Sequence, residues 1–398
     1  MKKHLIMIVG GYYPSPSATG RCAEDNIQLI QEQYDIDVIC LSRTDNLEYE
    51  YGGKKVFPVG NRYTHLQHIL RSSGTKILYR ILKAPVYIMD CFRNPNNLNW
   101  YVKAAYKKLE DIHSAKPIDV IFSVGAPMAS HCAAMRFKSV HPEVRWVTYS
   151  VDSYAAQNKN KKRFIEFEKS VLAKSDYNLL SEEIFNNSKF LYVDYQERVG
   201  TLPYLLPTMR HKTSQNHYFD SAKINLAYAG SFYKNIRNPA FLLNTFMQTN
   251  DEAVLHLFCS SDCDDLIDQT VVNSQGKIVR REMVGSDEIA DVYSEADMLV
   301  SVGNSLPEFK PSKTFEYIAT GKPILNIYYS GLKDDVLENY PLSSQICNSE
   351  EIKSAAEKMN EFILNCAGKK VSEEAIKSKF KKYMPENIRT IMLNALRG

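Results

Sequence analysis

The chain has 398 residues, of which 44% are hydrophobic and 24% are charged, and its formal net charge is +3. This length exceeds that of a usual single hydrophobic core, so two domains are expected. The composition is that of an ordinary globular protein and excludes a disordered or fibrous chain. The net charge is too small to indicate a nucleic-acid partner.

The eight cysteines stand mostly inside apolar segments and form neither a CxxC pair nor a metal-like arrangement with histidine. They indicate buried, reduced thiols in a cytoplasmic protein without a bound metal. The first apolar run, HLIMIVG, is only as long as a strand, so it does not predict a signal peptide. The chain contains no apolar stretch long enough to span a bilayer.

Short apolar runs of strand length alternate with helical patterns along almost the whole chain. This alternation predicts an α/β fold with two parallel sheets, each covered by helices. The predicted strands comprise residues 5–9, 36–41, 55–59, 118–124, 145–150 and 177–180 in the first half, then 224–229, 253–259, 277–281, 298–302 and 323–328. Between the halves, Pro203, Pro207 and a polar run indicate a linker, and residues 385–396 have a helical pattern.

The first predicted strand ends in the loop GGYYPSPSATGR, which opens a helix. A loop rich in Gly, Pro and Ser lets the backbone approach a ligand closely. The dinucleotide fingerprint GxGxxG cannot be laid over Gly10, Gly11 and Gly20, so a dehydrogenase is disfavoured.

The segment PEFKPSKTFEYIATGKPIL, residues 307–325, follows one predicted strand and leads into another through a helix. Its helix starts near Ser312 and Lys313, where free backbone N–H groups and the lysine charge favour a diphosphate. Glu316 lies about one turn into the helix, where it can accept a pair of ribose hydroxyls. Glu308 precedes the helix and is free to reach a sugar.

The spacing of Glu308 and Glu316, with the surrounding PSKxxEYxAxGKPI, resembles the paired-glutamate motif of retaining GT-B glycosyltransferases, notably glycosyltransferase family 4. The resemblance implies two Rossmann-like domains facing across a deep cleft. Residues 1–205 would bind the acceptor, residues 206–384 would bind the nucleotide-sugar donor, and a helix at about 385–398 would cross back to the first domain. It also implies hexosyl-type transfer to a hydroxyl of a saccharide or lipid-linked saccharide with retention of configuration, in bacterial surface polysaccharide or glycoconjugate synthesis. The nucleotide-sugar is then a substrate, and no cofactor or metal is expected.

The resemblance also assigns roles to individual residues. Many relatives have Arg directly after the glycine that Gly230 matches, whereas this chain has Ser231. Arg237 is then the preferred diphosphate ligand, because an Arg grips phosphate bidentately, and Lys234 is the second choice. The remaining expected site residues are Ser312, Lys313, Thr314 and Glu316 for the donor; Gly10, Gly11, Thr19, Gly20 and Arg21 for the diphosphate or acceptor loop; and Glu308, Asp152 and His131 for catalysis.

Residues 54–116 hold many more basic than acidic residues, and KNKKR follows at 159–163. Basic residues interleaved with aliphatic and aromatic ones are typical of a segment that binds an anionic membrane surface, and the alternative is a solvated face. The membrane interpretation places the protein peripherally on the inner face of the cell membrane. Asp262 and Asp264 form a DxD pair, which we interpret as a helix cap rather than a metal site.

Two other functions remain open at this point. A sugar-nucleotide 2-epimerase would eliminate and re-add the nucleotide instead of transferring the sugar. A non-catalytic nucleotide-sugar-binding partner in a polysaccharide assembly complex would do neither.

Overall fold

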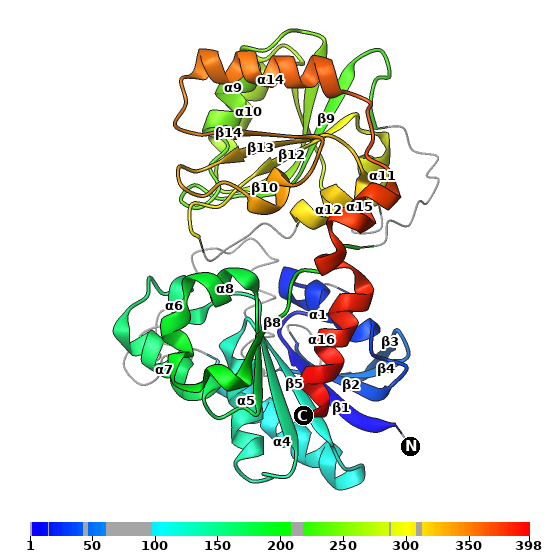
Figure 1. Ribbon diagram of the computed structural model, residues 1–398, viewed down its shortest axis with the longest axis vertical. Coiled ribbons are helices and arrows are strands. Elements are labelled where there is room, and N and C mark those ends of the chain that lie inside the picture. The colour runs from blue at the N-terminus through cyan, green and yellow to red at the C-terminus, as the bar shows by residue number, and fades with distance from the viewer. Residues whose placement is uncertain are drawn as a thin grey trace. The chain divides into compact units, whose positions relative to one another are not determined.

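The computed structural model describes residues 2–14, 16–42, 47–60, 98–207, 218–285, 288–307 and 313–398 (Figure 1). The chain divides into two compact units. We call Met1–Leu205 with Pro385–Gly398 unit 1, and Leu206–Met384 unit 2. Among the helices in the described ranges, none combines the length and the apolar character needed to cross a membrane. The α/β fold with two largely parallel sheets is confirmed.

Unit 1 is built on an eight-stranded sheet with the order β3-β4-β2-β1-β5-β6-β7-β8. Only the β3–β4 pair is antiparallel. The central strands are apolar and buried along almost their full length, because helices cover both faces of the sheet. The strands are β1 (Lys3–Val9), β2 (Tyr34–Leu41), β3 (Tyr49–Tyr51), β4 (Lys54–Val59), β5 (Val120–Gly125), β6 (Arg145–Ser150), β7 (Tyr177–Leu180) and β8 (Val199–Thr201).

The core of unit 1 lies between this sheet and its helices. Phe137 on α5 and Trp146 on β6 are fully buried in one apolar cluster. Figure 1 shows α4 and α5 on one side of the sheet and α1 and α16 on the other. The helices are α1 (Ala18–Gln28), α4 (Asn99–Ala115), α5 (Met128–Lys138), α6 (Tyr154–Gln157), α7 (Lys162–Leu172), α8 (Glu182–Asn187) and α16 (Pro385–Arg397), with short 3-10 turns at Lys189–Leu191 and Val193–Arg198.

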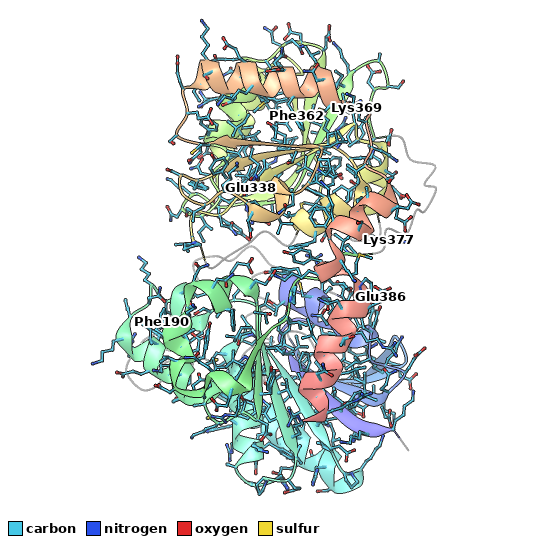
Figure 2. All side chains as sticks on the ribbon, viewed as in Figure 1. Phe190, Glu338, Phe362, Lys369, Lys377 and Glu386 are labelled. Carbon is cyan, nitrogen blue, oxygen red and sulfur yellow. The ribbon has the colours of Figure 1, made fainter. Side chains whose placement is uncertain are left out.

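Helix α16 brings the C-terminal end of the chain into unit 1. Its residues Ile388 and Leu396 are fully buried. The carbonyl oxygen of Ala395 accepts two hydrogen bonds from the guanidinium of Arg145, at 3.0 and 2.7 Å. A cation stabilises the last turn of a helix, and an acidic residue such as Glu386 stabilises the first turn (Figure 2). Both ends of α16 are therefore matched to the helix dipole.

Unit 2 is built on a six-stranded sheet with the order β11-β10-β9-β12-β13-β14, in which every pair is parallel. Helices α9, α10 and α14 lie on one side, and α11, α12 and α15 on the other (Figure 1). Phe362 of α14 packs against the core (Figure 2). The elements are β9 (Ile224–Phe232), α9 (Ala240–Met247), β10 (Ala253–Ser261), α10 (Asp264–Asn273), β11 (Ile278–Arg281), α11 (Ile289–Glu295), β12 (Met298–Val302), α12 (Lys313–Thr320), β13 (Ile324–Tyr328), α13 (Asp335–Glu338), β14 (Ser343–Cys347), α14 (Ile352–Cys366), α15 (Glu373–Lys379) and a 3-10 turn at Lys381–Tyr383.

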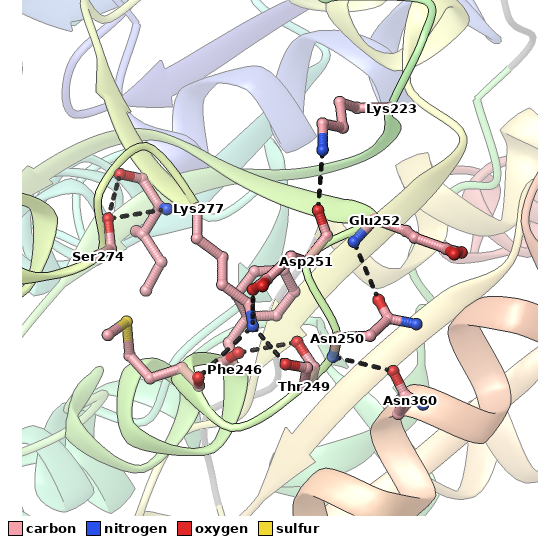
Figure 3. A network of polar contacts seen from close by, with 11 residues as sticks. Lys223, Phe246, Thr249, Asn250, Asp251, Glu252, Ser274, Lys277 and Asn360 are labelled. Carbon is pink, nitrogen blue, oxygen red and sulfur yellow. Dashed lines mark hydrogen bonds and ion pairs between the residues drawn. The ribbon is translucent and has the colours of Figure 1, made fainter.

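A polar network holds the loops at the amino ends of these strands (Figure 3). The ammonium group of Lys277 donates to the carbonyl of Thr249 and lies 3.3 Å from the carboxylate of Asp251. The carbonyl of Asp251 accepts from Lys223 at 2.9 Å. Since α9 ends at Met247, Lys277 satisfies carbonyl groups just beyond a helix end that would otherwise lack partners. This edge of unit 2 is a structural framework.

Candidate functional site

The candidate donor site lies at the opposite edge of the unit 2 sheet. Open parallel sheets bind ligands beyond the carboxyl ends of their strands. Gly230 and Ser231 lie near the carboxyl end of strand β9, and Lys234 and Arg237 follow in the next loop. Helix α12 starts at Lys313, after strand β12. Since β9 and β12 are neighbours, the topology brings those predicted donor residues of unit 2 that the structure describes to one edge of the sheet.

Three side chains form a cluster at the start of α12. The ammonium nitrogen of Lys313 lies 3.3 Å from the Oε2 atom of Glu316, and it donates to the hydroxyl of Tyr293 at 2.9 Å. The same Tyr293 hydroxyl lies 3.4 Å from Oε2 of Glu316. Side-chain exposure is 27% for Lys313 and 35% for Glu316, whereas Tyr293 is buried. A cation and a carboxylate thus face solvent together, as recognition of a phosphate and a diol requires.

Sequence analysis missed Tyr293. It stands in the pattern of apolar residues on α11, which predicts a core residue, and its ring does pack edge-on against Tyr317 at 5.2 Å. Burial is the main reason that the pKa of Tyr293 lies well above its ordinary value, so the hydroxyl keeps its proton. Only the tertiary fold brings that hydroxyl to Lys313 and Glu316.

Arg237 lies at the ends of two neighbouring strands. Its Nε atom donates to the side-chain oxygen of Asn304, just after β12, at 3.1 Å. One terminal nitrogen donates to the carbonyl of Ser231 at 3.4 Å, and the Ser231 hydroxyl is 2.7 Å from that of Ser260 on β10. These contacts hold the guanidinium at the carboxyl edge of the sheet, where its planar donors can bind a phosphate.

Lys234 is exposed, and its backbone N–H donates to the carboxylate of Asp262 at 2.6 Å. The helix-cap interpretation of the DxD pair is therefore only partly right. Asp264 lies in the first turn of α10 and pairs with Arg280 at 2.6 Å, but the N-cap residue is Cys263. Asp262 instead fixes the loop that carries Lys234.

Two predicted site residues lie outside the described residues, namely Glu308, expected for catalysis, and Ser312, expected for the donor. Thr314 is fully buried, and its hydroxyl donates to the carboxylate of Asp334 at 3.3 Å. Its side chain therefore belongs to the framework, and a contact with a ligand would have to come from its backbone.

The GK pair that ends the motif has a structural explanation. Gly321 adopts a φ of +75°, and a Cβ atom there would lie 2.6 Å from the carbonyl oxygen of Val371. Only glycine fits this helix end. The ammonium group of Lys322 donates to the carbonyls of Ser294 and Ala296, next to Tyr293 in sequence. Burial lowers the pKa of Lys322 to about 8. The end of α12 is thereby tied to the end of α11.

In unit 1, the glycines of the first loop serve close packing. A Cβ atom on Gly20 would lie 2.0 Å from the carbonyl oxygen of Gly11, and one on Gly10 would lie 2.5 Å from the ring of Pro127. Ser17 caps α1, since its hydroxyl accepts from the N–H of Gly20 at 3.1 Å. Of the other two predicted loop residues, Thr19 is buried and Arg21 is half-buried.

His131 and Asp152 differ in surroundings. The ring of His131 is only 1% exposed, and its nitrogens lie 2.8 Å from the Ser123 hydroxyl and 3.3 Å from the Ser150 hydroxyl. Burial lowers the pKa of His131 to about 3, so the ring is neutral. We therefore correct the catalytic expectation for His131 to a structural role, because an enclosed and saturated ring cannot reach a substrate. Asp152 follows β6, and burial raises its pKa to about 6, as suits proton transfer near neutral pH.

The basic segment is described only in part. Residues 61–97, with Arg71, Lys76, Arg80 and Lys83, lie outside the described residues. Lys54 is 3% exposed, and its ammonium group forms an ion pair at 2.9 Å with the carboxylate of buried Glu24. The expectation that Lys54 belongs to a membrane-binding surface is therefore wrong. Lys161, Lys162 and Arg163 of the second run are exposed.

The described residues also contain a His and Glu group that sequence spacing did not show. Ligand atoms of His113, His141 and Glu143 lie within 4.8 Å of one another. However, the Nδ1 atom of His113 accepts from the N–H of Ile118 at 3.1 Å, so the neutral ring carries its proton on the other nitrogen. His113 comes before β5 in the chain, and His141 and Glu143 come before β6. The three residues therefore lie at the amino edge of the sheet, opposite the carboxyl edge where such sheets bind ligands.

A cavity of about 670 Å³ also lies at an amino edge, in unit 2. Two of the three carboxylates that line it already accept hydrogen bonds from the backbone. Asp297 accepts from the N–H of Asn225 at 2.7 Å, and Glu295 accepts from those of Tyr218 and Phe219 at 2.9 and 3.3 Å. We therefore consider the carboxyl edge, and not this cavity, to be the candidate site.

No protein-family model matches the chain, and no curated protein matches it. Solved structures match nearly its full length. Sucrose-phosphate synthase from Thermosynechococcus elongatus has a TM-score of 0.71 at 12% identity, covering 100% of this chain and 98% of that chain. UDP-forming α,α-trehalose-phosphate synthase from Burkholderia xenovorans has 0.63 at 11%, covering 100% and 99%. HepE from Anabaena in complex with UDP-glucose has 0.63 at 9%, covering 98% and 99%. At such identities the similarity shows the fold alone, and that fold is GT-B, as predicted.

Proposed function

We propose that the protein is a retaining glycosyltransferase that moves a sugar from a nucleotide-sugar to a hydroxyl of a saccharide or lipid-linked saccharide. The observation that carries the proposal is the solvent-facing cluster of Lys313 and Glu316 at the start of α12, in a chain with this fold. HepE was solved with UDP-glucose, which supports a nucleotide-sugar as the donor here.

The donor would be held by charge and by hydrogen bonds. Lys313 and Arg237 would bind the diphosphate, and their positive charges would stabilise the negative charge that develops on it as it leaves. Glu316 would accept the two ribose hydroxyls in charge-assisted hydrogen bonds. This set supplies the stabilisation without a metal ion, so we expect activity to persist in a chelator.

The catalytic roles rest on Glu308 and Asp152. Glu308 would orient the sugar and support positive charge at the anomeric carbon. Asp152 would face the incoming hydroxyl, and its pKa of about 6 lets the carboxyl accept a proton near neutral pH. Retention of configuration follows from the family resemblance of the Glu308 and Glu316 spacing.

We further propose that unit 1 binds an anionic membrane surface, as expected for a lipid-linked acceptor used in bacterial surface polysaccharide or glycoconjugate synthesis. Exposed Lys161, Lys162 and Arg163 support this, in addition to the basic segment that precedes them. Each cation near such a surface is worth about 1 kcal/mol. Cosedimentation with acidic vesicles at low and moderate salt tests the proposal. Wild-type protein that stays in the supernatant at both salt concentrations would remove it.

The function itself is tested by a thermal-shift screen with UDP, GDP, ADP and their sugars. A ligand at a hundredfold excess over its Kd adds about 2.7 kcal/mol of stability. Donor turnover in the presence of a chelator then separates the candidates. A transferase needs an acceptor, an epimerase converts the donor without one, and a binding protein turns over nothing. Turnover that the chelator abolishes would contradict the metal-free mechanism.

A further inference from the structure

The residue assigned to the ribose and the residue assigned to the phosphate bind each other in this structure. The ammonium nitrogen of Lys313 is 3.3 Å from Oε2 of Glu316. A carboxylate that binds both hydroxyls of a ribose needs both of its oxygens. One of those oxygens is engaged by Lys313 and is also 3.4 Å from the Tyr293 hydroxyl.

Tyr293 holds the lysine in that position. Its hydroxyl accepts from Lys313 at 2.9 Å, and the ammonium group also lies 5.6 Å from the centre of the Tyr293 ring. The ring is 1% exposed and packs against Tyr317, so it cannot follow a ligand. Lys313 has a flexible four-carbon stem and is 27% exposed, so it can turn toward a phosphate.

We propose that Lys313, Glu316 and Tyr293 form a gate that makes ribose recognition conditional on a phosphate group. A diphosphate draws the ammonium group away from Glu316 and frees Oε2 for the ribose. A nucleoside has no group to move Lys313, so it competes with the lysine for the carboxylate. The site therefore selects nucleoside diphosphates over nucleosides through Tyr293, a positioning residue. This inference rests on the proposed function, since it assigns a diphosphate to the site.

The gate predicts opposite effects of one substitution on two ligands. Lys313→Met keeps the aliphatic stem and removes the charge. Affinity for UDP or GDP should fall at least about tenfold, because a phosphate ligand is lost. Affinity for uridine or guanosine should rise about two- to fivefold, the size of a partly exposed ion pair. Calorimetry with the diphosphates and ligand-observed NMR titration with the nucleosides measure both quantities. Lys313→Gln provides a second variant if the first is unstable.

Tyr293→Phe separates positioning from packing. It keeps the ring and removes the hydroxyl that holds Lys313, so nucleoside affinity should rise about twofold while diphosphate affinity stays within a factor of two. The matched control is Tyr340→Phe. Tyr340 is another buried tyrosine of unit 2, and its hydroxyl donates to the carbonyl of Lys322 at 2.8 Å. Its loss should change neither affinity.

The outcomes of these titrations distinguish failure of the gate from failure of the proposed function. If Lys313→Met lowers nucleoside and diphosphate affinity in proportion, Lys313 is a plain phosphate ligand and the gate is wrong, while the proposed function stands. Equal effects of Tyr293→Phe and Tyr340→Phe would likewise overturn the positioning role. If the wild type binds none of UDP, GDP and ADP, the proposed function fails and the gate fails with it.

Discussion

The carboxyl edges of the two sheets use polar side chains in different ways. In unit 1, His131 is enclosed and bonded to two serine hydroxyls, so it holds neighbouring strands together. In unit 2, Lys313 and Glu316 are partly exposed to solvent and form an ion pair with each other. A polar residue after a strand can therefore serve either packing or binding. Burial, which sequence position does not reveal, decides between them.

The largest expected effect is on the stability of unit 1. His131→Ala removes a buried ring and its hydrogen bonds to two serine hydroxyls, of which only Ser123 keeps a partner among the described residues, the indole N–H of Trp146. The free energy of unfolding should therefore fall by about 3 kcal/mol. Chemical denaturation measures this, and nucleotide affinity of the folded fraction should not change. A variant of wild-type stability that has lost activity would return His131 to the catalytic residues.

The next effect is on turnover. Glu308→Gln keeps the shape of the side chain and removes its charge, so the rate should fall about a hundredfold, equivalent to about 2.7 kcal/mol. Affinity for the free nucleoside diphosphate should hardly change, because that ligand has no sugar for Glu308 to hold. Turnover with donor and acceptor in a chelator, beside a binding titration, tests both parts. Full turnover would exclude Glu308 from the site.

Glu316→Ala should lower nucleotide affinity and leave stability almost unchanged, whereas His131→Ala should lower stability and leave affinity unchanged. Loss of charge-assisted hydrogen bonds to the ribose should weaken nucleoside diphosphate binding by about 2 kcal/mol. Stability should change by less than about 0.5 kcal/mol, because the side chain is 35% exposed and a partly solvated ion pair such as that with Lys313 contributes little. Calorimetric titration and denaturation of the same preparation measure the two effects. Unchanged affinity in a folded variant would contradict the ribose assignment.

The smallest effect depends on pH. Burial raises the pKa of Asp152 from 3.8 to about 6, so the folded state binds the proton more tightly than the unfolded state. The stability that this contributes is fully present below pH 3.8 and is lost as the pH rises through 6. Asp152→Asn should therefore stabilise the protein by about 1–2 kcal/mol at pH 7 and by almost nothing at pH 3.5. Chemical denaturation of the wild type and the variant at both pH values checks this. An equal change in the free energy of unfolding at the two pH values would contradict the raised pKa of Asp152.

All eleven predicted strands are present in the structure, because most of them are apolar runs buried on both faces of a sheet that helices cover. Sequence analysis missed β3 (YEY), β8 (VGT) and β14 (SSQIC), which have only half-buried or exposed positions apart from Ile346. Each is at or near the end of a sheet, where one side is open and polar residues are tolerated. Their apolar pattern is therefore too weak to predict a strand.

The periodicity of the sequence by itself determined the α/β class, and the resemblance of a spaced motif predicted the GT-B fold and a group of candidate donor residues around α12, since periodicity and a spaced motif are local properties. The tertiary structure decided the rest. It enclosed His131 and Lys54, and it brought Tyr293 from α11 to Lys313 and Glu316 on α12. It also explained Gly10, Gly20 and Gly321 by close packing. Exposure and contacts between distant segments depend on how whole elements pack, and no local pattern of residues specifies that packing.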